Sequence, residues 1–240
     1  MPHYKYLIVG GGMTADAAVS GIRELDPEGP IGLISAEPNP PYNLPPLSKG
    51  LWKGEAPDSI WRGTDKHNVT FHLGVKAQSL DAPKKTVADE QGSVYTFEKL
   101  LFATGATPRR LPFDDGSVIY YRTVQDYENL RVRTAQGRRF AVIGGGFIGW
   151  EITAALAMNG KEVVMLFPGE AIGDHIYPID LARFLSDYYQ QKGVTVVSRS
   201  AVLGLEKEPR GTNVKTRGQG EFLVDGVVAG IGVTPNVELA

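Results

Sequence analysis

Val9-Gly10-Gly11-Gly12-Met13-Thr14-Ala15 is a glycine-rich turn, and the chain repeats it at Ile143-Gly144-Gly145-Gly146-Phe147-Ile148-Gly149. Each turn follows a short apolar run and precedes a helix-like run that is rich in alanine. This strand–turn–helix context is typical of dinucleotide-binding units. Glycine is needed because the backbone must bend sharply and approach a pyrophosphate without a Cβ in between. The amides at the start of the following helix then bind the negative charge.

The pattern around the two turns predicts an α/β protein, because strand-like and helix-like runs alternate. We expect strands at 5–9, 31–35, 100–103, 139–143, 162–167 and 194–197, and helices at 13–25, 147–159 and 180–192. Residues 36–47 contain five prolines and are expected to lack regular structure. In the last helix, the spacing of Leu181, Phe184, Leu185 and Tyr188 predicts a buried apolar face. Two dinucleotide-binding units in one chain indicate electron transfer between two dinucleotides.

The composition excludes several kinds of site. The chain has no cysteine, which excludes disulfides, thiolate-bound metals and thiol catalysis within it. Its four histidines lack the spacing of metal ligands, so we expect no metal site. The net charge of −2 gives no electrostatic reason for binding nucleic acid or an anionic membrane. No apolar run is long enough to span a bilayer, and the chain enters a strand almost at once, so we expect a cytoplasmic location without a signal peptide.

Glu37 is the candidate ribose-binding acid of the first unit. It follows the predicted strand 31–35, and in dinucleotide folds an acid at the end of the second strand binds the ribose hydroxyls. The alternative is a solvated loop carboxylate. The order of strand, glycine turn, helix, strand and acid favours the ribose role.

Several segments resemble the motifs of one protein family; they occur in the same order as in that family and span nearly the whole chain. The segment at 41–52 reads PYNLPPLSKGLW, and further matching pieces are ATGATPR at 103–109, GGGFIGWE at 144–151 and GIGVTPN at 230–236. They resemble the flavin-dependent ferredoxin and rubredoxin reductases and apoptosis-inducing factor, within the pyridine nucleotide–disulfide oxidoreductase superfamily. The resemblance implies two Rossmann-like units of the glutathione-reductase-like FAD/NAD fold, with the first unit incomplete.

The resemblance also implies a role for each matching residue. FAD belongs to the first unit and NADH to the second. The residues expected at FAD are Gly10, Gly12, Ala15, Glu37, Ala77, Thr104, Gly105 and Arg109, and those expected at NADH are Gly144, Gly146, Gly149, Glu170 and Gly232. One departure is Leu44, which stands where the family usually has an arginine and so removes a cation that would contact FAD.

Lys49 and Glu151 resemble the family's charge pair beside flavin and nicotinamide, which makes them the candidate catalytic residues. A buried lysine needs a carboxylate partner, and such a pair sets the electric field around the flavin. The alternative is that Lys49 is a surface charge and that Glu151 is an acid of the first helical turn, where the helix dipole favours it. Spacing alone does not separate the two interpretations, and the resemblance favours the pair.

Glu170 is the candidate ribose acid of the second unit, although Phe167 occupies the position where a glutamate often stands. A solvated loop acid is an equal alternative for Glu170. We expect no Arg or Lys near Glu170 to meet a 2′-phosphate, so NADH is expected rather than NADPH. Because the chain has no cysteine pair, the flavin is expected to pass electrons directly to an acceptor.

The resemblance further implies that a strand and a domain follow residue 240, so we read the chain as truncated. The expected domains are an FAD-binding part at 1–112 without its returning strand, an NAD-binding part at 113–236, and the start of the return at 237–240. The missing strand leaves an open sheet edge at 100–103, where self-association is expected. The expected function is an FAD-dependent NADH oxidoreductase that passes electrons to a carrier such as ferredoxin or rubredoxin. The alternative is a truncated, non-catalytic dinucleotide-binding module or redox sensor.

Overall fold

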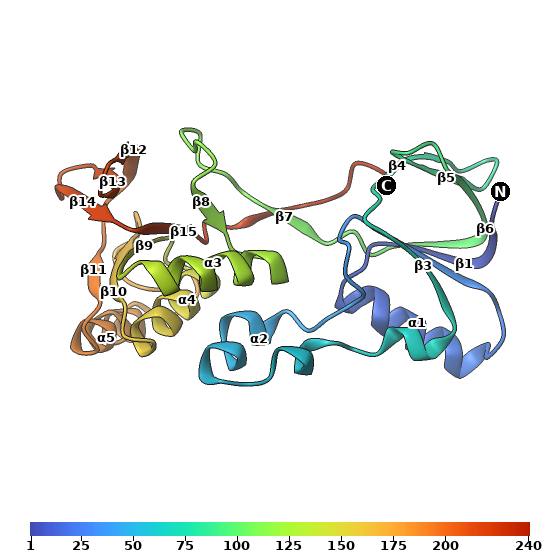
Figure 1. The fold of residues 1–240 in the computed structure, drawn as a ribbon, viewed down its shortest axis with the longest axis horizontal. Coiled ribbons are helices and arrows are strands. Elements are labelled where there is room, and N and C mark those ends of the chain that lie inside the picture. Colours follow the sequence, from blue (N-terminus) through green and yellow to red (C-terminus); the bar gives the residue numbers. More distant parts are fainter. The chain divides into compact units, whose positions relative to one another are not determined.

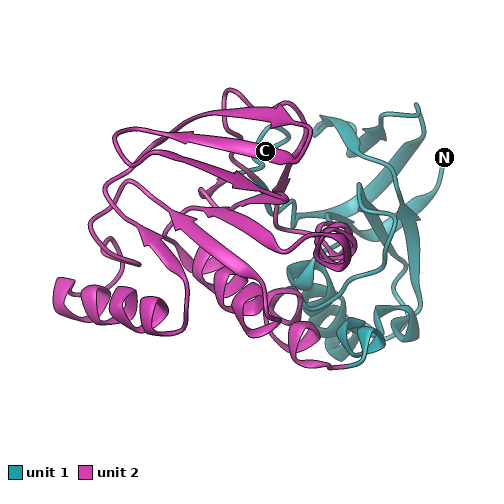
Figure 2. Ribbon diagram, turned by 60° about the vertical axis from the view of Figure 1, so that its left-hand side comes forward, with its two compact units in different colours: residues 1–44, 56–107, 235–240 teal, residues 45–55, 108–234 magenta.

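The computed structural model describes residues 1–240 and divides into two compact units. Unit 1 comprises residues 1–44, 56–107 and 235–240, and unit 2 comprises residues 45–55 and 108–234 (Figure 2). Each unit contains a mainly parallel sheet with helices, so the predicted α/β class is confirmed. The short strands β7 (Ala106–Pro108) and β16 (Val233–Pro235) pair where the chain passes from one unit to the other.

Unit 1 is built on a six-stranded sheet in the order β3-β2-β1-β6-β5-β4 (Figure 1). The strands β3, β2, β1 and β6 run parallel, β5 pairs antiparallel with β6, and β4 pairs antiparallel with β5. Its elements are β1 (His3–Val9), α1 (Met13–Leu25), β2 (Ile31–Ser35), β3 (Val69–Leu73), β4 (Ala77–Asp81), β5 (Thr86–Asp89) and β6 (Val94–Phe102), with 3-10 turns at Pro57–Ile60 and Thr64–His67. The strand predicted at 100–103 is the last part of a longer strand, β6, which begins at Val94.

The two faces of this sheet carry separate apolar clusters. Helix α1 covers one face, where Ala15 and Val19 pack on Ile8, Ile31 and Leu33. The residues of β4, β5 and the first half of β6 close over the other face and pack on β1. The first glycine turn therefore leads from the central strand into a helix that is held firmly against the sheet.

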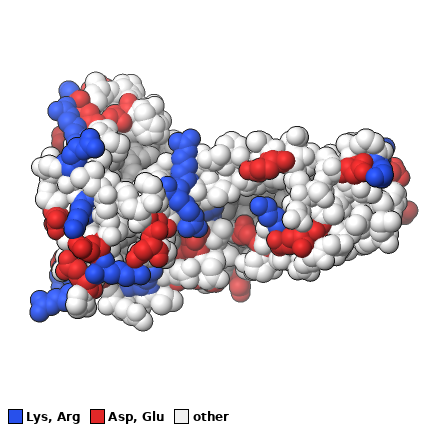
Figure 3. Space-filling model, turned by 90° about the horizontal axis from the view of Figure 1, so that it is seen from above, with Lys and Arg blue, Asp and Glu red and all other residues white.

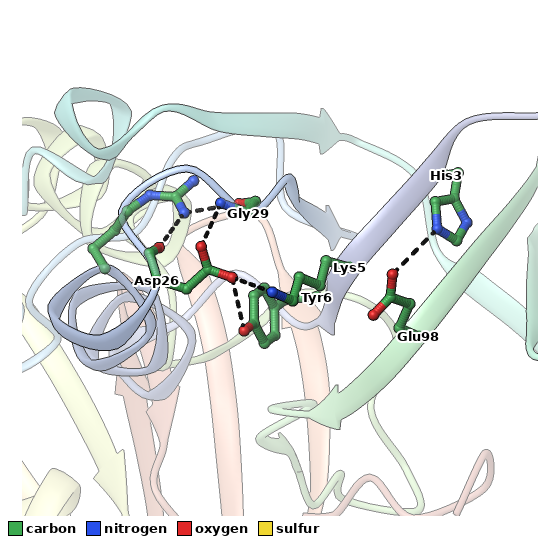
Figure 4. Close-up of polar contacts among 7 residues, drawn as sticks. His3, Lys5, Tyr6, Asp26, Gly29 and Glu98 are labelled. Atoms are coloured by element: carbon green, nitrogen blue, oxygen red, sulfur yellow. Dashed lines mark hydrogen bonds and ion pairs between the residues drawn. The ribbon is translucent and has the colours of Figure 1, made fainter.

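Asp26 fixes the far end of α1 to the sheet (Figure 4). Its carboxylate accepts hydrogen bonds from Lys5 Nζ at 2.6 Å, the Gly29 amide at 2.8 Å and the Tyr6 hydroxyl at 3.0 Å. The hydrogen bond from Lys5, together with the other donors, holds the pKa of Asp26 well below its usual range. Asp26 thus sets where the helix ends and where the chain returns to β2.

Unit 2 is built on a five-stranded parallel sheet in the order β11-β10-β9-β15-β8 (Figure 1). Its elements are α2 (Pro45–Ser48), a 3-10 turn at Gly50–Lys53, β8 (Val118–Tyr120), α3 (Val124–Gln136), β9 (Arg139–Ile143), α4 (Phe147–Met158), β10 (Glu162–Leu166), α5 (Ile179–Gln191), β11 (Thr195–Val197), β12 (Val202–Glu208), β13 (Gly211–Thr216), β14 (Glu221–Val224) and β15 (Gly226–Ala229). The antiparallel sheet β12-β13-β14 packs its apolar side onto β9, β10 and β15.

Two local predictions were wrong. In α5 the residues Leu181, Phe184 and Tyr188 are exposed, because the helix instead buries the small residue Ala182. The proline-rich segment does contain one short helix, α2, which begins at Pro45. Proline is compatible with a first helical turn, because its missing N–H has no partner there in any case.

Most of the face in Figure 3 is uncharged, and the Lys, Arg, Asp and Glu side chains are scattered over it without an extended area of one sign. None of the helices combines the length and the apolar character needed to cross a bilayer.

Candidate dinucleotide-binding sites

The first glycine of each turn is required by the protein itself. Gly10 and Gly144 have φ angles of +125° and +122°, which L-residues with side chains rarely adopt. A Cβ on Gly10 would lie 2.0 Å from the Ala103 carbonyl oxygen, and one on Gly144 would lie 2.3 Å from that of Gly230. The two turns thus share one geometry, in which the strand ends against the backbone of a neighbouring segment.

The third glycine of each triplet is suited to its position for a different reason. Gly12 and Gly146 have ordinary extended conformations, and a Cβ at Gly12 would meet nothing within 4 Å. At Gly146 the nearest atom to such a Cβ is His175 Nε2, at 3.9 Å. The protein therefore leaves open space at both positions, which suits a ligand that approaches the backbone closely.

The helices that follow these glycines begin without side-chain caps. Gly12 is the N-cap of α1 and Gly146 is the N-cap of α4, and neither helix start receives a side-chain hydrogen bond. By contrast, α3 is closed by a capping box between Thr123 and Asp126. The first amides of α1 and α4 are therefore available to an anion. The open glycines and free amides fit a dinucleotide pyrophosphate at each turn.

The fourth predicted turn position differs between the units. Ala15 is completely buried under the sheet of unit 1. In unit 2 the equivalent residue is Gly149, where a Cβ would lie 2.0 Å from the Gly144 carbonyl oxygen. Helix and turn therefore pack more tightly in unit 2, and only glycine fits there.

Glu37 lies just beyond β2, as expected for a ribose-binding acid. Its carboxylate accepts a hydrogen bond of 2.5 Å from the Tyr42 hydroxyl. Ala77 is the first residue of β4, and its side chain is buried in a core cluster of unit 1, so only its backbone is available to a ligand.

Asn236 joins the predicted turn residues Thr104 and Gly105. The Thr104 hydroxyl donates to the Asn236 carbonyl oxygen at 2.6 Å, and the Asn236 amide donates to the Gly105 carbonyl oxygen at 3.1 Å. In unit 2, the Arg109 amide donates to the carbonyl oxygen of Gly232 at 3.0 Å. The structure therefore links the sequence motifs 103–109 and 230–236, while the Arg109 side chain remains exposed.

Glu170 is not free of cations, and the premise that no Arg stands near it was wrong. Arg183 Nε donates to its Oε1 at 2.8 Å, and Arg199 Nη2 lies 2.8 Å from its Oε2. Hydrogen bonds from Arg183 and then Arg199 lower the pKa of Glu170. All three side chains line a cavity of about 270 Å³ beside α5 and β11. Glu170 thus pairs with two cations, one from α5 and one from the segment that follows β11.

Lys49 and Glu151 lie together in unit 2, with Lys49 Nζ 2.9 Å from Glu151 Oε1. Two details differ from expectation. The Lys49 side chain is 53% exposed rather than buried, whereas that of Glu151 is 19% exposed. Glu151 also lies in the second turn of α4, so it is not a first-turn acid stabilised by the helix dipole.

Several polar residues near these sites were not identified from the sequence. Ser48 Oγ donates to Glu151 Oε2 at 2.6 Å. In unit 1, the buried Asp16 of α1 accepts hydrogen bonds of 2.5 Å from Arg62 Nε and from the Thr64 hydroxyl. Arg62 also donates to Oδ1 of Asn43, the residue before Leu44, where the resembling family usually has an arginine. The only sequence signal for Ser48 is its place beside Lys49, and nothing local marks Arg62.

Comparison with known proteins gives one consistent family. The family model of the pyridine nucleotide-disulphide oxidoreductases matches residues 4–240. The chain is 32% identical to a ferredoxin reductase subunit of 5,5′-dehydrodivanillate O-demethylase from Sphingobium sp., over 98% of this chain and 60% of the relative. It is also 32% identical to the ferredoxin–NAD+ reductase component of an anthranilate 1,2-dioxygenase system from Burkholderia cepacia, with the same coverage of both chains.

The solved structures agree. A ferredoxin reductase from Rhodopseudomonas palustris superposes with a TM-score of 0.90 at 26% identity, over 98% of this chain and 60% of that one. Putidaredoxin reductase in its complex with putidaredoxin gives 0.89 at 26% identity, over 97% and 59%. The chain therefore spans about 60% of the length of the relatives it matches. This family consists of oxidoreductases that use FAD and NAD(H), and the chain belongs to it.

Proposed function

We propose that the protein is an FAD-dependent NADH oxidoreductase in which unit 1 binds FAD and unit 2 binds NADH. The observation that carries the proposal is the repeated turn, in which an open glycine precedes an uncapped helix in each unit. A pyrophosphate at each helix start would satisfy amides that the protein itself leaves without partners. Two such sites in one chain suit electron transfer between two dinucleotides.

The bound cofactors supply the redox chemistry, with hydride passing from nicotinamide to flavin. The residues of this chain bind and orient them. In our proposal Gly10, Gly12 and Ala15 form the FAD pyrophosphate turn, and Glu37 accepts hydrogen bonds from ribose hydroxyls. Thr104, Gly105, Arg109 and the backbone of Ala77 contribute the rest of the FAD contacts. In unit 2, Gly144, Gly146, Gly149, Glu170 and Gly232 take the corresponding roles for NADH.

Lys49 is the residue we assign to the electrostatics of the flavin. Its ammonium is a cation that would favour the negative charge gained on reduction. Glu151 holds that ammonium in place through the 2.9 Å ion pair. The Lys49 side chain is 53% exposed, so the part of the ammonium that does not face Glu151 is free to contact a ligand.

The electron acceptor in this proposal is a carrier protein such as ferredoxin or rubredoxin. The chain contains no cysteine, so no dithiol within it accepts electrons from the flavin. The names of its relatives, which include ferredoxin reductases, support a ferredoxin. For the domains we propose FAD binding by residues 1–112, NAD binding by residues 113–236, and a return towards the FAD part at 237–240.

We also propose that this chain self-associates through β6. That strand pairs with β5 only over Val94–Thr96, while its later residues pair only with β1. Leu101 is 39% exposed there. An unpaired strand edge of this kind attracts another chain. Light scattering of the purified protein tests this, and a strictly monomeric mass at all concentrations would contradict it.

The binding assignment is tested by calorimetry with two matched variants. Gly12→Val places a side chain in the open space of unit 1, and Gly146→Val does so in unit 2. Gly12→Val should abolish FAD binding and leave NADH binding intact, and Gly146→Val should do the reverse. Loss of both cofactors in either folded variant, or of neither, would contradict the assignment.

A further inference from the structure

Both oxygens of the Glu151 carboxylate are occupied by two consecutive residues. Lys49 Nζ lies 2.9 Å from Oε1, and Ser48 Oγ lies 2.6 Å from Oε2. Glu151 is on α4, whereas Ser48 is the last residue of α2, so the contact joins elements far apart in sequence. The carboxylate is therefore held at two points and cannot rotate freely about its last side-chain bond.

The serine hydroxyl has one proton, and its geometry shows where that proton goes. Besides the carboxylate at 2.6 Å, Ser48 Oγ has only the Pro45 carbonyl oxygen, at 3.4 Å. A hydroxyl-to-carboxylate bond of this length is typical of a strong, charge-assisted hydrogen bond. Ser48 is also 6% exposed, so water does not compete efficiently for the carboxylate oxygen.

The backbone that carries Ser48 is fixed independently. The carbonyl oxygen of Leu47 accepts a 2.8 Å hydrogen bond from Trp52 Nε1 and a second one from the Tyr121 hydroxyl. Asn159 of unit 2 donates to the Trp52 carbonyl oxygen at 3.1 Å. Burial raises the pKa of Tyr121, so its hydroxyl stays protonated and able to donate. Ser48 is thus a short, buried side chain on a clamped backbone.

Lys49 differs in every one of these respects. Its side chain is long, flexible and 53% exposed, so the lysine alone cannot fix the direction of the carboxylate. An exposed ion pair also contributes little free energy, because holding two flexible side chains in one geometry costs conformational entropy. Of the two partners, Ser48 is the one able to orient Glu151, and Glu151 in turn orients the lysine.

We propose that Ser48 is a positioning residue, which fixes the Glu151 carboxylate and through it the Lys49 ammonium in the orientation used for flavin reduction. This inference rests on the proposed function of the Lys49–Glu151 pair. Without the Ser48 hydroxyl, Oε2 loses its donor and the carboxylate can turn. The ammonium then samples several positions, and its average field at the flavin weakens.

The first part of the test needs no cofactor. Ser48→Ala, Glu151→Gln and the double variant are compared by urea unfolding of the protein without FAD. We expect the two substitutions to be non-additive, because the residues are in direct contact. Additive effects would show that the hydrogen bond does not form, and would overturn the inference.

The second part uses the FAD-loaded protein and stopped-flow reduction by NADH. Ser48→Ala should slow hydride transfer several-fold and make the flavin midpoint potential more negative, with the Kd of NADH changed less than twofold. Ser48→Thr, which keeps the hydroxyl, should restore most of the rate. Thr153→Val is the matched control, because Thr153 lies on the same helix, is fully buried, and has a hydroxyl without a partner.

The outcomes separate this inference from the proposed function. If NADH reduces the wild-type flavin but Ser48→Ala leaves both the rate and the potential unchanged, the positioning role is wrong and the proposed function stands. If Ser48→Thr is as slow as Ser48→Ala, the hydroxyl is not the cause and the inference fails. If the wild-type protein holds FAD that NADH does not reduce, the proposed function is wrong and the inference falls with it.

Discussion

Replacing Glu170 by glutamine should shift the nucleotide preference of unit 2 towards NADPH. Glu170 accepts hydrogen bonds from Arg183 and lies in an ion pair with Arg199, beside a cavity of about 270 Å³. Asp187 also lines this cavity, so its charged side chains sum to zero, two positive and two negative. Glutamine keeps the shape and one acceptor oxygen but leaves a net charge of about +1, which favours a 2′-phosphate.

The magnitude follows from Coulomb's law. Removing one negative charge about 6 Å from a phosphate of charge about −2 changes its energy by roughly 332 × 2/(80 × 6), or about 1.4 kcal/mol, with water-like screening. This corresponds to about a tenfold fall in the ratio of the Kd of NADPH to that of NADH. NADH carries no 2′-phosphate, so its own Kd should change much less.

The assay is calorimetry of both nucleotides at low and high salt. The shift should shrink as the salt concentration rises, because the Debye length falls to about 10 Å at 0.1 M. Glu162→Gln is the matched control: Glu162 pairs with Arg138 at 2.9 Å, but at the opposite end of β10. An unchanged ratio in Glu170→Gln, with NADH binding intact, would refute the placement of Glu170 at the ribose. An equal shift in Glu162→Gln would refute the local explanation.

Three further outcomes are expected. Lys49→Ala and Glu151→Ala should each slow flavin reduction more than they weaken NADH binding. In stopped-flow measurements the losses of rate in the double variant should be non-additive, because removing either partner isolates the other. Additive losses would show that the pair does not act as a unit. Gly10→Ala should destabilise the protein by about 3 kcal/mol or more, since its Cβ would lie 2.0 Å from a carbonyl oxygen. Gly12→Ala should cost about 1 kcal/mol or less of stability and mainly weaken FAD binding. Equal urea midpoints for the two variants would contradict this interpretation. The pKa of Glu170 is lowered in the folded state, so its ion pairs stabilise the fold fully above the ordinary pKa range of glutamate, and this stabilisation is lost as the pH falls below that range. The difference in urea midpoint between wild type and Glu170→Gln should therefore vanish in acid. A difference that persists at low pH would contradict the charge-based account.

The features that the sequence predicted well are local ones. The turn at Gly10–Gly12 could be recognised because its glycines, the preceding strand and the following helix are adjacent in the chain. The same holds for the turn at Gly144–Gly146. Each helix start and each strand end there is determined by residues within a few positions of the turn, so a short pattern contains the needed information.

The features that the sequence did not reveal depend on distant neighbours. Arg199 reaches Glu170 only because β11 lies beside β10 in the sheet. The hydrogen bond of Ser48 to Glu151 depends on how α2 packs on α4, which no spacing rule gives. In α5, periodicity identified an apolar stripe, but not whether anything covers it. Phe184 is 63% exposed, whereas the small residue Ala182 of the same helix is fully buried.

The most direct test of the account is anaerobic addition of NADH to the FAD-loaded protein, followed by flavin absorbance near 450 nm, roughly the maximum of oxidised flavin. We predict that this absorbance falls in proportion to the NADH added, until one equivalent has reduced the bound FAD. A protein that retains FAD and binds NADH, yet keeps its full absorbance with excess NADH, would contradict the claim that the two turns serve electron transfer between two dinucleotides.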